Sequence, residues 1–408
     1  MSPFSALFGQ MHWVLTVGSG AWDFIAQPLG AKEYTNIIDK FKAIRGKPID
    51  PILDYLRESG VRCQRVPGGS ALTVSQYFAA ARREGSLVGN VSTAVLLGTE
   101  SEGPAAELTK DSSDYLDVLR KLDIQVLQRR RQGSMPRCLY VVHPDKAYEA
   151  IRWWEPGVNV SDDVELPNDI EDVISRYQTV ILATPPPAVG RRFVPLLGSA
   201  FVVYNPGLVL RDYNLDDSAF REIMPKAHVL VVNRAEAKRI MDQQQSYSTK
   251  GRRLRPSEFE AMKELFQEYG GSRGNLEMVI VTLGAYGAMI INREKPDSAM
   301  VCTLSLKKRG LKLDPKEIKS TIGCGDAFVA GCVGAMWTGQ ELEDILLAGT
   351  DLASGALRHI GGSNPRFFQN LEPNGTYTLG IDRRTVPLEE GSSSEDPQGR
   401  KKRVANNE

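Results

Sequence analysis

Residues 320–328, Ser-Thr-Ile-Gly-Cys-Gly-Asp-Ala-Phe, decide how the rest of this chain is interpreted. They place Gly323, Gly325 and the carboxylate of Asp326 at the start of residues 327–337, which contain no charge and no proline. Small residues keep such a segment thin, so it can be buried on every side against a sheet. We therefore expect a tightly packed helix over 327–337, with Asp326 at its amino-terminal end.

The chemistry of this helix start indicates phosphoryl transfer. The two glycines let the backbone turn sharply and aim N–H groups at one point, where the helix dipole also favours negative charge. A carboxylate is a poor ligand for phosphate, but it is a good base for a hydroxyl that attacks a phosphate. Taken alone, the stretch also fits an ordinary glycine-containing helix start with an Asp near its cap.

This stretch resembles the C-terminal signature of the ribokinase-like (PfkB-type) family of sugar and nucleoside kinases. Cys324 stands where the family usually has Ala or Gly. The resemblance implies that Asp326 takes the proton of the acceptor hydroxyl. It also implies that backbone N–H groups around Gly323, Cys324 and Gly325 stabilise the transferring phosphate. A thiol at a helix N-terminus can have a lowered pKa, so oxidant sensitivity of Cys324 is a secondary hypothesis.

Residues 66–73, Val-Pro-Gly-Gly-Ser-Ala-Leu-Thr, are similar to the family's N-terminal Gly-Gly motif. Adjacent glycines before a helix let the backbone approach a polyhydroxylated ligand closely. The resemblance implies that Gly68, Gly69 and Thr73 contact the acceptor, although the family often has Asn in place of Thr73. An ordinary helix-entry turn would have the same glycines.

Residues 233–236, Asn-Arg-Ala-Glu, follow the apolar run 229–232 and match the family's Asn-x-x-Glu motif. The resemblance implies that Asn233 and Glu236 help to hold the magnesium and phosphate region, largely through water. Hard oxygen ligands suit Mg²⁺, which tends to keep several waters. The same tetrapeptide fits a capping box at a helix start, and both interpretations can be true together.

Residues 279–288 contain Thr-Leu-Gly-Ala-Tyr-Gly and are similar to the family's Thr-Leu-Gly-x-x-Gly segment. A β-branched run leads into a turn, and 289–291 predict a second strand of a hairpin. The resemblance implies that Thr282, Gly284 and Gly287 frame the nucleotide.

Asp23 follows the predicted first strand, residues 13–17, after Gly18 and Gly20. A dinucleotide-binding fingerprint needs a third glycine where Asp23 stands, so we reject an NAD site. In the resembled family, an Asp just after this strand holds substrate hydroxyls, and a carboxylate can accept two such hydrogen bonds. A solvated turn residue is the alternative.

Composition limits the remaining function classes. The 408 residues include 50 Lys plus Arg and 50 Asp plus Glu, which argues against nucleic-acid or anionic-membrane partners. Five cysteines without close pairing and four histidines predict a reduced, cytoplasmic protein without structural zinc. The basic run 400–403 leaves nuclear access open.

Apolar β-rich runs alternate with helical patterns along the chain, which predicts a mostly parallel sheet covered on both faces. The resemblance implies that this sheet belongs to a ribokinase-like three-layer α/β/α domain. The kinase domain would span residues 11–383, and the resemblance implies a small β lid contributed by about 24–66 and 134–157. Residues 384–408 are rich in Ser, Glu, Gly and Lys and are expected to be disordered. The turn 205–207, Asn-Pro-Gly, is expected at the ligand edge of the sheet.

The resulting hypothesis is ATP-dependent phosphorylation of a hydroxyl on a small sugar. A nucleoside kinase close to adenosine kinase is one alternative, and a catalytically silent metabolite-binding member that acts through a partner is another. The resemblance implies ATP and Mg²⁺, leaves a monovalent cation open, and is compatible with a monomer or a homodimer.

Overall fold

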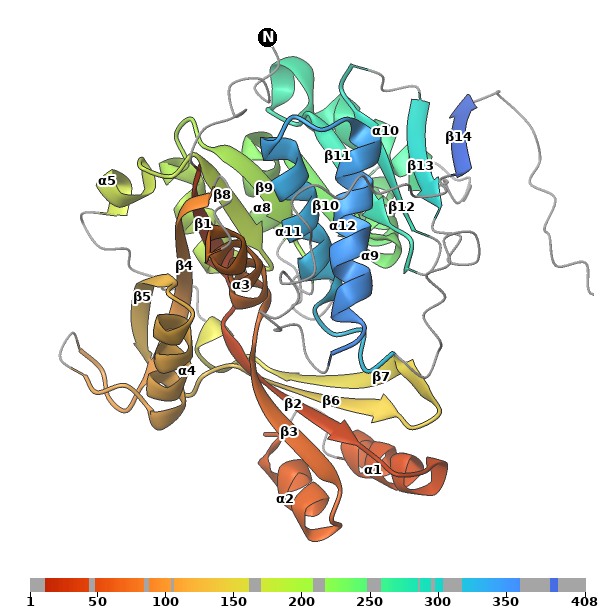
Figure 1. The fold of residues 1–408 in the computed structure, drawn as a ribbon. Helices are drawn as coiled ribbons and strands as arrows, with labels where there is room; N and C mark the ends of the chain where they lie inside the picture. Colours follow the sequence, from red (N-terminus) through yellow and green to blue (C-terminus); the bar gives the residue numbers. More distant parts are fainter. Residues whose placement is uncertain are drawn as a thin grey trace, which may run out of the picture.

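The computed structural model describes residues 12–43, 48–83, 88–103, 106–160, 170–207, 217–247, 258–284, 287–294, 298–303, 318–359 and 382–387. Over these ranges the chain forms a ten-stranded sheet and a separate four-stranded sheet. Figure 1 shows helices on both faces of the large sheet, with the small sheet below it. None of the helices in these ranges combines the length and apolar character that crossing a bilayer requires.

The large sheet has the strand order β14-β13-β12-β11-β10-β9-β8-β1-β4-β5. Neighbouring strands from β5 to β11 pair in parallel, whereas the pairs β11–β12, β12–β13 and β13–β14 are antiparallel. The hairpin expected from the sequence is therefore present as β11–β12. The strands are β1 (His12–Gly18), β4 (Val88–Thr99), β5 (Gln125–Gln132), β8 (Thr179–Ala183), β9 (Phe201–Asn205), β10 (Val229–Asn233), β11 (Met278–Thr282), β12 (Ala288–Asn292), β13 (Ser298–Thr303) and β14 (Asp382–Pro387).

Both faces of the parallel strands are buried, so their sequences are continuously apolar. In β10, Val229 and Val231 join one core cluster, whereas Leu230 and Val232 join the cluster on the opposite face. The first face is covered by α3 (Ser70–Arg83), α4 (Lys110–Lys121), α11 (Cys324–Trp337) and α12 (Leu342–Ala356). The second is covered by α5 (Ile170–Ile174), α6 (Pro187–Phe193), α8 (Asp217–Ile223), α9 (Arg234–Tyr247) and α10 (Glu258–Tyr269). The expected three-layer α/β/α architecture is confirmed.

Helix α11 shows why its sequence is so rich in small residues. Residues 327–333 and 335–337 are buried. A Cβ atom on Gly331 would lie 2.4 Å from the backbone oxygen of Ala348 in α12, so the two helices can approach this closely only with glycine there. The expected helix is present, and it begins three residues earlier than the apolar run.

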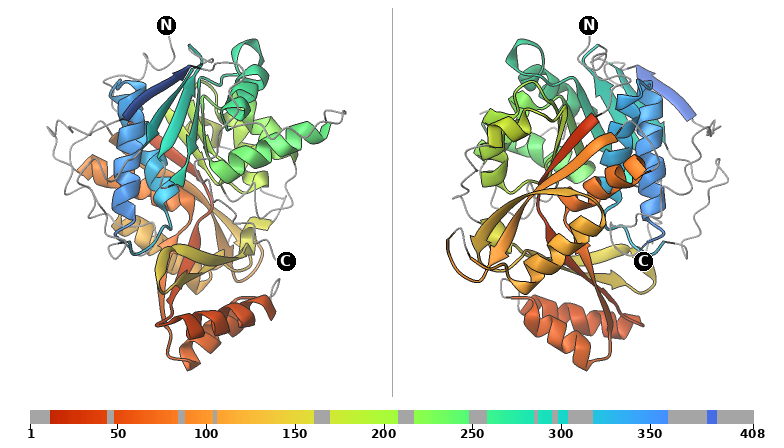
Figure 2. Two further views of the ribbon diagram at one scale, coloured as in Figure 1. Left: turned by 90° about the vertical axis from the view of Figure 1, so that its right-hand side faces the viewer. Right: turned by 60° about the vertical axis from the view of Figure 1, so that its left-hand side comes forward.

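The small sheet has the order β3-β2-β6-β7 and lies within or beside the two segments expected to form a lid. Its strands are β2 (Ala21–Gln27), β3 (Arg62–Gly68), β6 (Arg137–His143) and β7 (Lys146–Glu155). Two amphipathic helices that the sequence expectation lacked, α1 (Ala31–Ala43) and α2 (Asp50–Glu58), pack against it in a separate core. Figure 2 shows both helices at the end of the molecule furthest from the large sheet.

The position of β1 sets where the two sheets meet. Its neighbours are β4 on one side and β8 on the other, so the chain order reverses at β1. Ligands of open α/β sheets bind outside the carboxyl ends of the strands at such a reversal. Only Ser19 and Gly20 separate β1 from β2, so the small sheet begins at this same point.

The structure corrects one expectation about the polar C-terminal segment. Residues 384–387, expected to be disordered, belong to β14 and pair with the edge strand β13. Backbone hydrogen bonding to an open edge needs little apolar side-chain surface, so composition alone missed this strand. Residues 388–408 lie outside the described ranges. Helix α9 continues through Tyr247, and residues 248–255 also lie outside the described ranges.

Candidate active site

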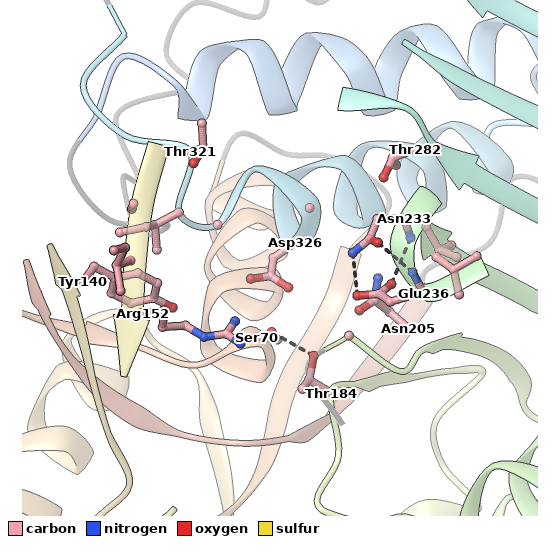
Figure 3. A pocket seen from close by; sticks show the side chains of 18 residues that line it. Ser70, Tyr140, Arg152, Thr184, Asn205, Asn233, Glu236, Thr282, Thr321 and Asp326 are labelled. Carbon is pink, nitrogen blue, oxygen red and sulfur yellow. Dashed lines mark hydrogen bonds between the residues drawn. The ribbon is translucent and has the colours of Figure 1, made fainter. Parts of the chain in front are cut away.

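A pocket of about 730 Å³ lies at the carboxyl ends of the parallel strands and against the small sheet. Figure 3 shows it from close by. Its walls come from loops after β8, β9, β10 and β11, from the start of α11, and from the lid strands β6 and β7. It is lined by Ser70, Tyr140, Ala150, Ile151, Arg152, Thr184, Asn205, Gly207, Val231, Val232, Asn233, Glu236, Thr282, Thr321, Ile322, Gly323, Gly325 and Asp326.

Asp326 reaches this pocket from the first turn of α11. Gly323 precedes the helix with φ +79°, a conformation that favours glycine. Apart from its chain neighbours and the adjacent backbone of α11, no heavy atom of the described residues lies within 4 Å of where a side chain on Gly325 would begin, so the backbone itself borders the pocket there. Burial raises the pKa of the Asp326 carboxyl to about 6, and a hydrogen bond from the hydroxyl of Ser70 acts in the opposite direction.

Asp23 lies in β2 beside the pocket and is 5% exposed. Burial raises the pKa of its carboxyl to about 8; the negative charge of Asp326 adds to the rise and the positive charge of Arg152 opposes it. A Cβ atom on Gly68 would lie 2.1 Å from Oδ2 of Asp23, so glycine is required for the carboxyl to occupy this place. A Cβ on Gly69, which has φ +88°, would lie 2.2 Å from the Ser19 backbone oxygen.

Asn233 and Glu236 form the capping box that their spacing predicts. The backbone N–H of Asn233 donates to Glu236 Oε2 at 2.9 Å, and the Glu236 N–H donates to Asn233 Oδ1 at 2.9 Å. The Asn233 amide also donates to Glu236 Oε1 at 2.6 Å. Burial raises the pKa of Glu236 to about 7, and these hydrogen bonds oppose the rise. The capping role is therefore confirmed, and both side chains still face the pocket.

These oxygens also fit a magnesium site of the water-mediated kind. Asn233 and Glu236 supply an amide oxygen and a carboxylate, which are hard ligands. Among the described residues, no cluster of three or more His, Cys, Asp or Glu side chains could hold a metal directly. A metal here would therefore keep much of its water shell.

Of the remaining residues proposed from the sequence, some line the pocket and others lie next to it or away from it. Thr282 lines the pocket, whereas Gly284 and Gly287 form the adjoining turn, in which the Leu283 N–H donates to the Gly287 oxygen at 2.7 Å. The hydroxyl of Thr73 donates to the Gly69 oxygen at 3.2 Å at the start of α3, and Thr73 is not among the residues that line the pocket.

The pKa of the Cys324 thiol is shifted in the direction opposite to the one that the sequence hypothesis required. Burial raises the pKa of the thiol to about 12, and the nearby charge of Asp326 adds to this rise. The raised pKa argues against an activated thiol at Cys324.

The pocket also contains side chains that the sequence analysis did not assign to the site. Arg152 lies on β7, where its partner in the strand register is Tyr140. Thr184 follows β8, and Asn205 ends β9 at the turn already expected on the ligand edge. Arg152 is the only Lys or Arg among the described residues that line the pocket. A lid arginine leaves no local signal, because its orientation depends on the register between distant strands.

The architecture is similar to that of solved sugar and nucleoside kinases. Ribokinase from Thermotoga maritima matches with a TM-score of 0.60 over 88% of this chain and 100% of its own, at 15% identity. Adenosine kinase from Schistosoma mansoni, solved with 2-fluoroadenosine, matches with a TM-score of 0.63 over 88% of this chain and 98% of its own, at 12% identity. These similarities establish a ribokinase-like fold.

Sequence comparison identifies the family. An adenosine kinase from Schizophyllum commune is 27% identical over 144 residues, and the match spans 35% of this chain and 38% of that relative. The pfkB family carbohydrate kinase pattern matches residues 106–367, which is more than half of the chain. The chain belongs to the pfkB family of carbohydrate kinases, whose members are phosphotransferases.

Proposed function

We propose that this protein transfers the γ-phosphoryl group of ATP to a hydroxyl of a small sugar or nucleoside. The observation that carries the proposal is the position of Asp326. Its carboxylate enters the pocket from a glycine-framed helix start, with the Asn233–Glu236 pair on one side and Arg152 on the other (Figure 3). A base, an anion-binding helix terminus and hard oxygen ligands are the groups that phosphoryl transfer to an alcohol requires.

Asp326 acts as the general base in this mechanism. It takes the proton from the acceptor hydroxyl as the oxygen attacks the γ-phosphorus, and ADP leaves. The N–H groups around Gly323, Cys324 and Gly325 stabilise the charge on the transferring group. The dipole of α11 adds to this effect, and such fixed dipoles usually make the largest electrostatic contribution. Because the pKa of Asp326 is about 6, the carboxylate is mostly ionised at neutral pH and is still basic enough to accept a proton.

Asn233 and Glu236 would hold Mg²⁺ through water, and the bound ion would neutralise part of the charge of the ATP phosphates. Thr282 borders the same end of the pocket, and the turn at Gly284 and Gly287 leaves room for a nucleotide because neither residue has a side chain. The pKa of Glu236, about 7, is expected to fall when a cation is bound nearby.

Asp23 binds the acceptor at the end of the pocket opposite the nucleotide region. Its carboxyl is buried, and none of the described side chains donates a hydrogen bond to it. Burying a carboxyl without hydrogen-bond partners costs free energy, so the hydroxyls of a bound acceptor would supply the missing partners. The lid strands bring Tyr140 and Arg152 over the same space and exclude water, which would otherwise compete as the acceptor. Arg152 supplies positive charge where the ionised carboxylates of Asp326 and Glu236 would repel a phosphate.

The acceptor class has two candidates, because hydroxyl-binding groups serve a sugar and a ribonucleoside equally well. The match to an adenosine kinase supports inclusion of nucleosides in any test. ADP release should be measured with Mg-ATP and, in turn, D-ribose, D-fructose, adenosine and inosine, with an acceptor-free reaction as control. We expect release above the control with at least one of them. Binding of an acceptor without turnover would instead favour a catalytically silent member.

A further inference from the structure

Two short segments connect the small sheet to the large domain beside Asp23. Residues 19–20 lead from β1 into β2, and residues 68–69 lead from β3 into α3. The two segments touch each other, because a Cβ atom on Gly69 would collide with the backbone oxygen of Ser19. The Asp23 carboxyl lies against the second segment, since a Cβ atom on Gly68 would overlap it. The position of Gly68 therefore decides where this carboxyl can lie.

The side chain of Tyr115 on α4 contacts both segments. It is fully buried, and its hydroxyl donates to the Gly68 oxygen at 2.8 Å. A Cβ atom on Gly20 would lie 2.9 Å from Tyr115 Oη, so the same hydroxyl packs against the first segment. The next carbonyl, that of Gly69, accepts from the Thr73 N–H at 3.0 Å. Helices α4 and α3 thus bind two consecutive carbonyls of the second segment.

Strand β2 is also attached to α4 through its other face. Side chains alternate along a strand, so Trp22 and Asp23 point to opposite faces of β2. The Trp22 ring packs edge-on against Tyr115, with 5.8 Å between the ring centroids, and its Nε1–H donates to the Asp111 oxygen at 3.0 Å. The Arg65 guanidinium of β3 lies 3.7 Å from the centroid of the Trp22 ring and pairs with the Asp111 carboxylate at 2.7 Å. These contacts fix both strands to one helix of the large domain.

The carboxyl of Asp23 needs such a restraint. Hydrogen bonds weaken steeply when donor and acceptor are misaligned, so a carboxyl that binds acceptor hydroxyls must have a fixed position. Its cross-strand partner is Val66, and Gly68 is the diagonal neighbour against which it lies. Glycine has no side chain that could restrain the carboxyl, so the Gly68 backbone must itself be fixed. The hydrogen bond from Tyr115 fixes it.

We propose that Tyr115, supported by Trp22, is a positioning residue of the acceptor site, because its hydroxyl fixes Gly68 and thereby the carboxyl of Asp23. This inference rests on the proposed function, in which Asp23 binds the acceptor. Tyr115 touches no reacting atom in this account and acts through Asp23. Helix α4 contributes none of the described residues that line the pocket, so no sequence motif indicated this role.

The surroundings of Asp23 make its ionisation a measure of its position. Burial is the main reason that its pKa is raised to about 8. The charged and titratable groups that face it are Asp326 on α11, Arg152 on β7, Tyr115 on α4, and Tyr140 and Cys138 on β6. A carboxyl that leaves its place against Gly68 gains contact with water, and its pKa then falls.

The first test is therefore the titration of Asp23 in Tyr115→Phe, which removes one hydroxyl, keeps the ring and alters no other group around the carboxyl. Protein labelled with ¹³C in its aspartate carboxyl groups would be titrated by NMR without any acceptor, and Asp23→Asn would assign the resonance. The Asp23 pKa should fall by about one unit in Tyr115→Phe.

The second test is a double-mutant cycle on acceptor binding near pH 9, where Asp23 is mostly ionised. The probes are D-ribose, D-fructose, adenosine and inosine, and calorimetry would use those that the wild type binds. Tyr115→Phe alone should weaken binding about tenfold, with ATP affinity unchanged. Added to Asp23→Ala it should have almost no further effect, because Tyr115 acts through Asp23.

Two further variants complete the design. Tyr177→Phe is the matched control, because Tyr177 is also buried and its hydroxyl donates to Ser92 Oγ at 2.7 Å, in the core on the opposite face of the large sheet. It should change neither the Asp23 titration nor acceptor affinity. Trp22→Phe keeps an aromatic ring but loses the bond to the Asp111 oxygen. It should lower the Asp23 pKa by a smaller amount than Tyr115→Phe.

The outcomes separate this inference from the proposed function. An unchanged Asp23 titration in Tyr115→Phe, an equal change in Tyr177→Phe, or an equal loss of acceptor affinity with and without Asp23 would overturn the positioning role. Failure of the wild type to phosphorylate any of the four probes would count against the proposed function, while the NMR titration would still decide whether Tyr115 positions Asp23. If Tyr115→Phe does not fold, the comparison of Trp22→Phe with Tyr177→Phe decides it.

Discussion

The three carboxylates at the candidate site share surroundings that oppose their own negative charge. Burial is the main reason that the pKa values of Asp23, Asp326 and Glu236 are all raised, to about 8, 6 and 7. Such an arrangement costs stability and is typical of functional sites. It also provides groups that become satisfied only when an acceptor, a cation and phosphates arrive.

Asp23→Asn should separate the stability cost from the function. The Asp23 pKa is raised in the folded protein above its ordinary value of 3.8, so protonation contributes stability that is complete below about pH 4 and is lost as the pH rises through about 8. An uncharged Asn avoids this loss. We expect Asp23→Asn to melt at a higher temperature than the wild type near pH 9 and at a similar temperature near pH 4.

Near pH 9, where the carboxyl of Asp23 is mostly ionised, the same substitution should weaken acceptor binding by about 2–4 kcal/mol, because acceptor hydroxyls lose a charged hydrogen-bond acceptor. ATP binding should stay the same. Calorimetry with the acceptor and with ATP would check both expectations. Equal acceptor affinity in the two proteins, or a melting difference that does not depend on pH, would remove Asp23 from the account.

We expect Arg152, on lid strand β7, to stabilise the negative charge of the transferring phosphoryl group. Arg152→Gln should lower single-turnover phosphoryl transfer by about 10²-fold, as loss of a charge-stabilising donor typically does. The Kd for ATP should change much less, and Arg152→Lys should restore part of the rate. Arg62→Gln, an exposed arginine on lid strand β3, is the control. Equal rates in Arg152→Gln and the control would show that Arg152 has only a structural role.

The sequence predicted the site residues that stand in short motifs and missed those that reach the site through the tertiary fold. Asp326 and Glu236 stand in short motifs whose spacing alone indicates their chemistry. Ser70 and Thr184 meet at the pocket across 114 residues of sequence, and Arg152 lies there because of the register between β6 and β7. Such contacts leave no periodic or local pattern in the chain.

At the scale of elements, period and composition predicted most of the large domain. The apolar strands and α11 were expected because burial on both faces requires uninterrupted apolar sequence. The lid helices α1 and α2 and the edge strand β14 were missed. Each contains many charged residues, and each is stabilised by contacts with elements far away in sequence.

Strand β14 provides a prediction about stability. A truncation after residue 381 should lower the melting temperature by several degrees and promote self-association, because it leaves the backbone of β13 without its partner. A truncation after Pro387 is the matched control and should melt like the full chain, since residues 388–408 offer little apolar surface to bury. Differential scanning calorimetry and light scattering would compare the three proteins. Identical behaviour of both truncations would contradict the assignment of β14 as a structural strand.

For the whole molecule, the strand order explains why the site lies where it does. The order reverses at β1, and the chain enters the small sheet just after β1. The pocket therefore has a rigid wall of strand ends and helix α11 on one side and the lid on the other. The fold class was predictable because alternating strands and helices allow few arrangements. The acceptor was not, since the same hydroxyl-binding groups fit several molecules.

The central claim is that Asp326 is the base for phosphoryl transfer, and Asp326→Asn tests it most directly. Asn keeps the size of the side chain but cannot take the proton, so single-turnover transfer to the identified acceptor should fall by about 10²–10⁴-fold. That loss corresponds to about 3–5 kcal/mol of barrier lowering. ATP binding, measured in parallel, should be unchanged or slightly tighter, because a negative charge near the phosphates is gone. If Asp326→Asn transfers the phosphoryl group at a rate within about threefold of the wild type, Asp326 is not the base.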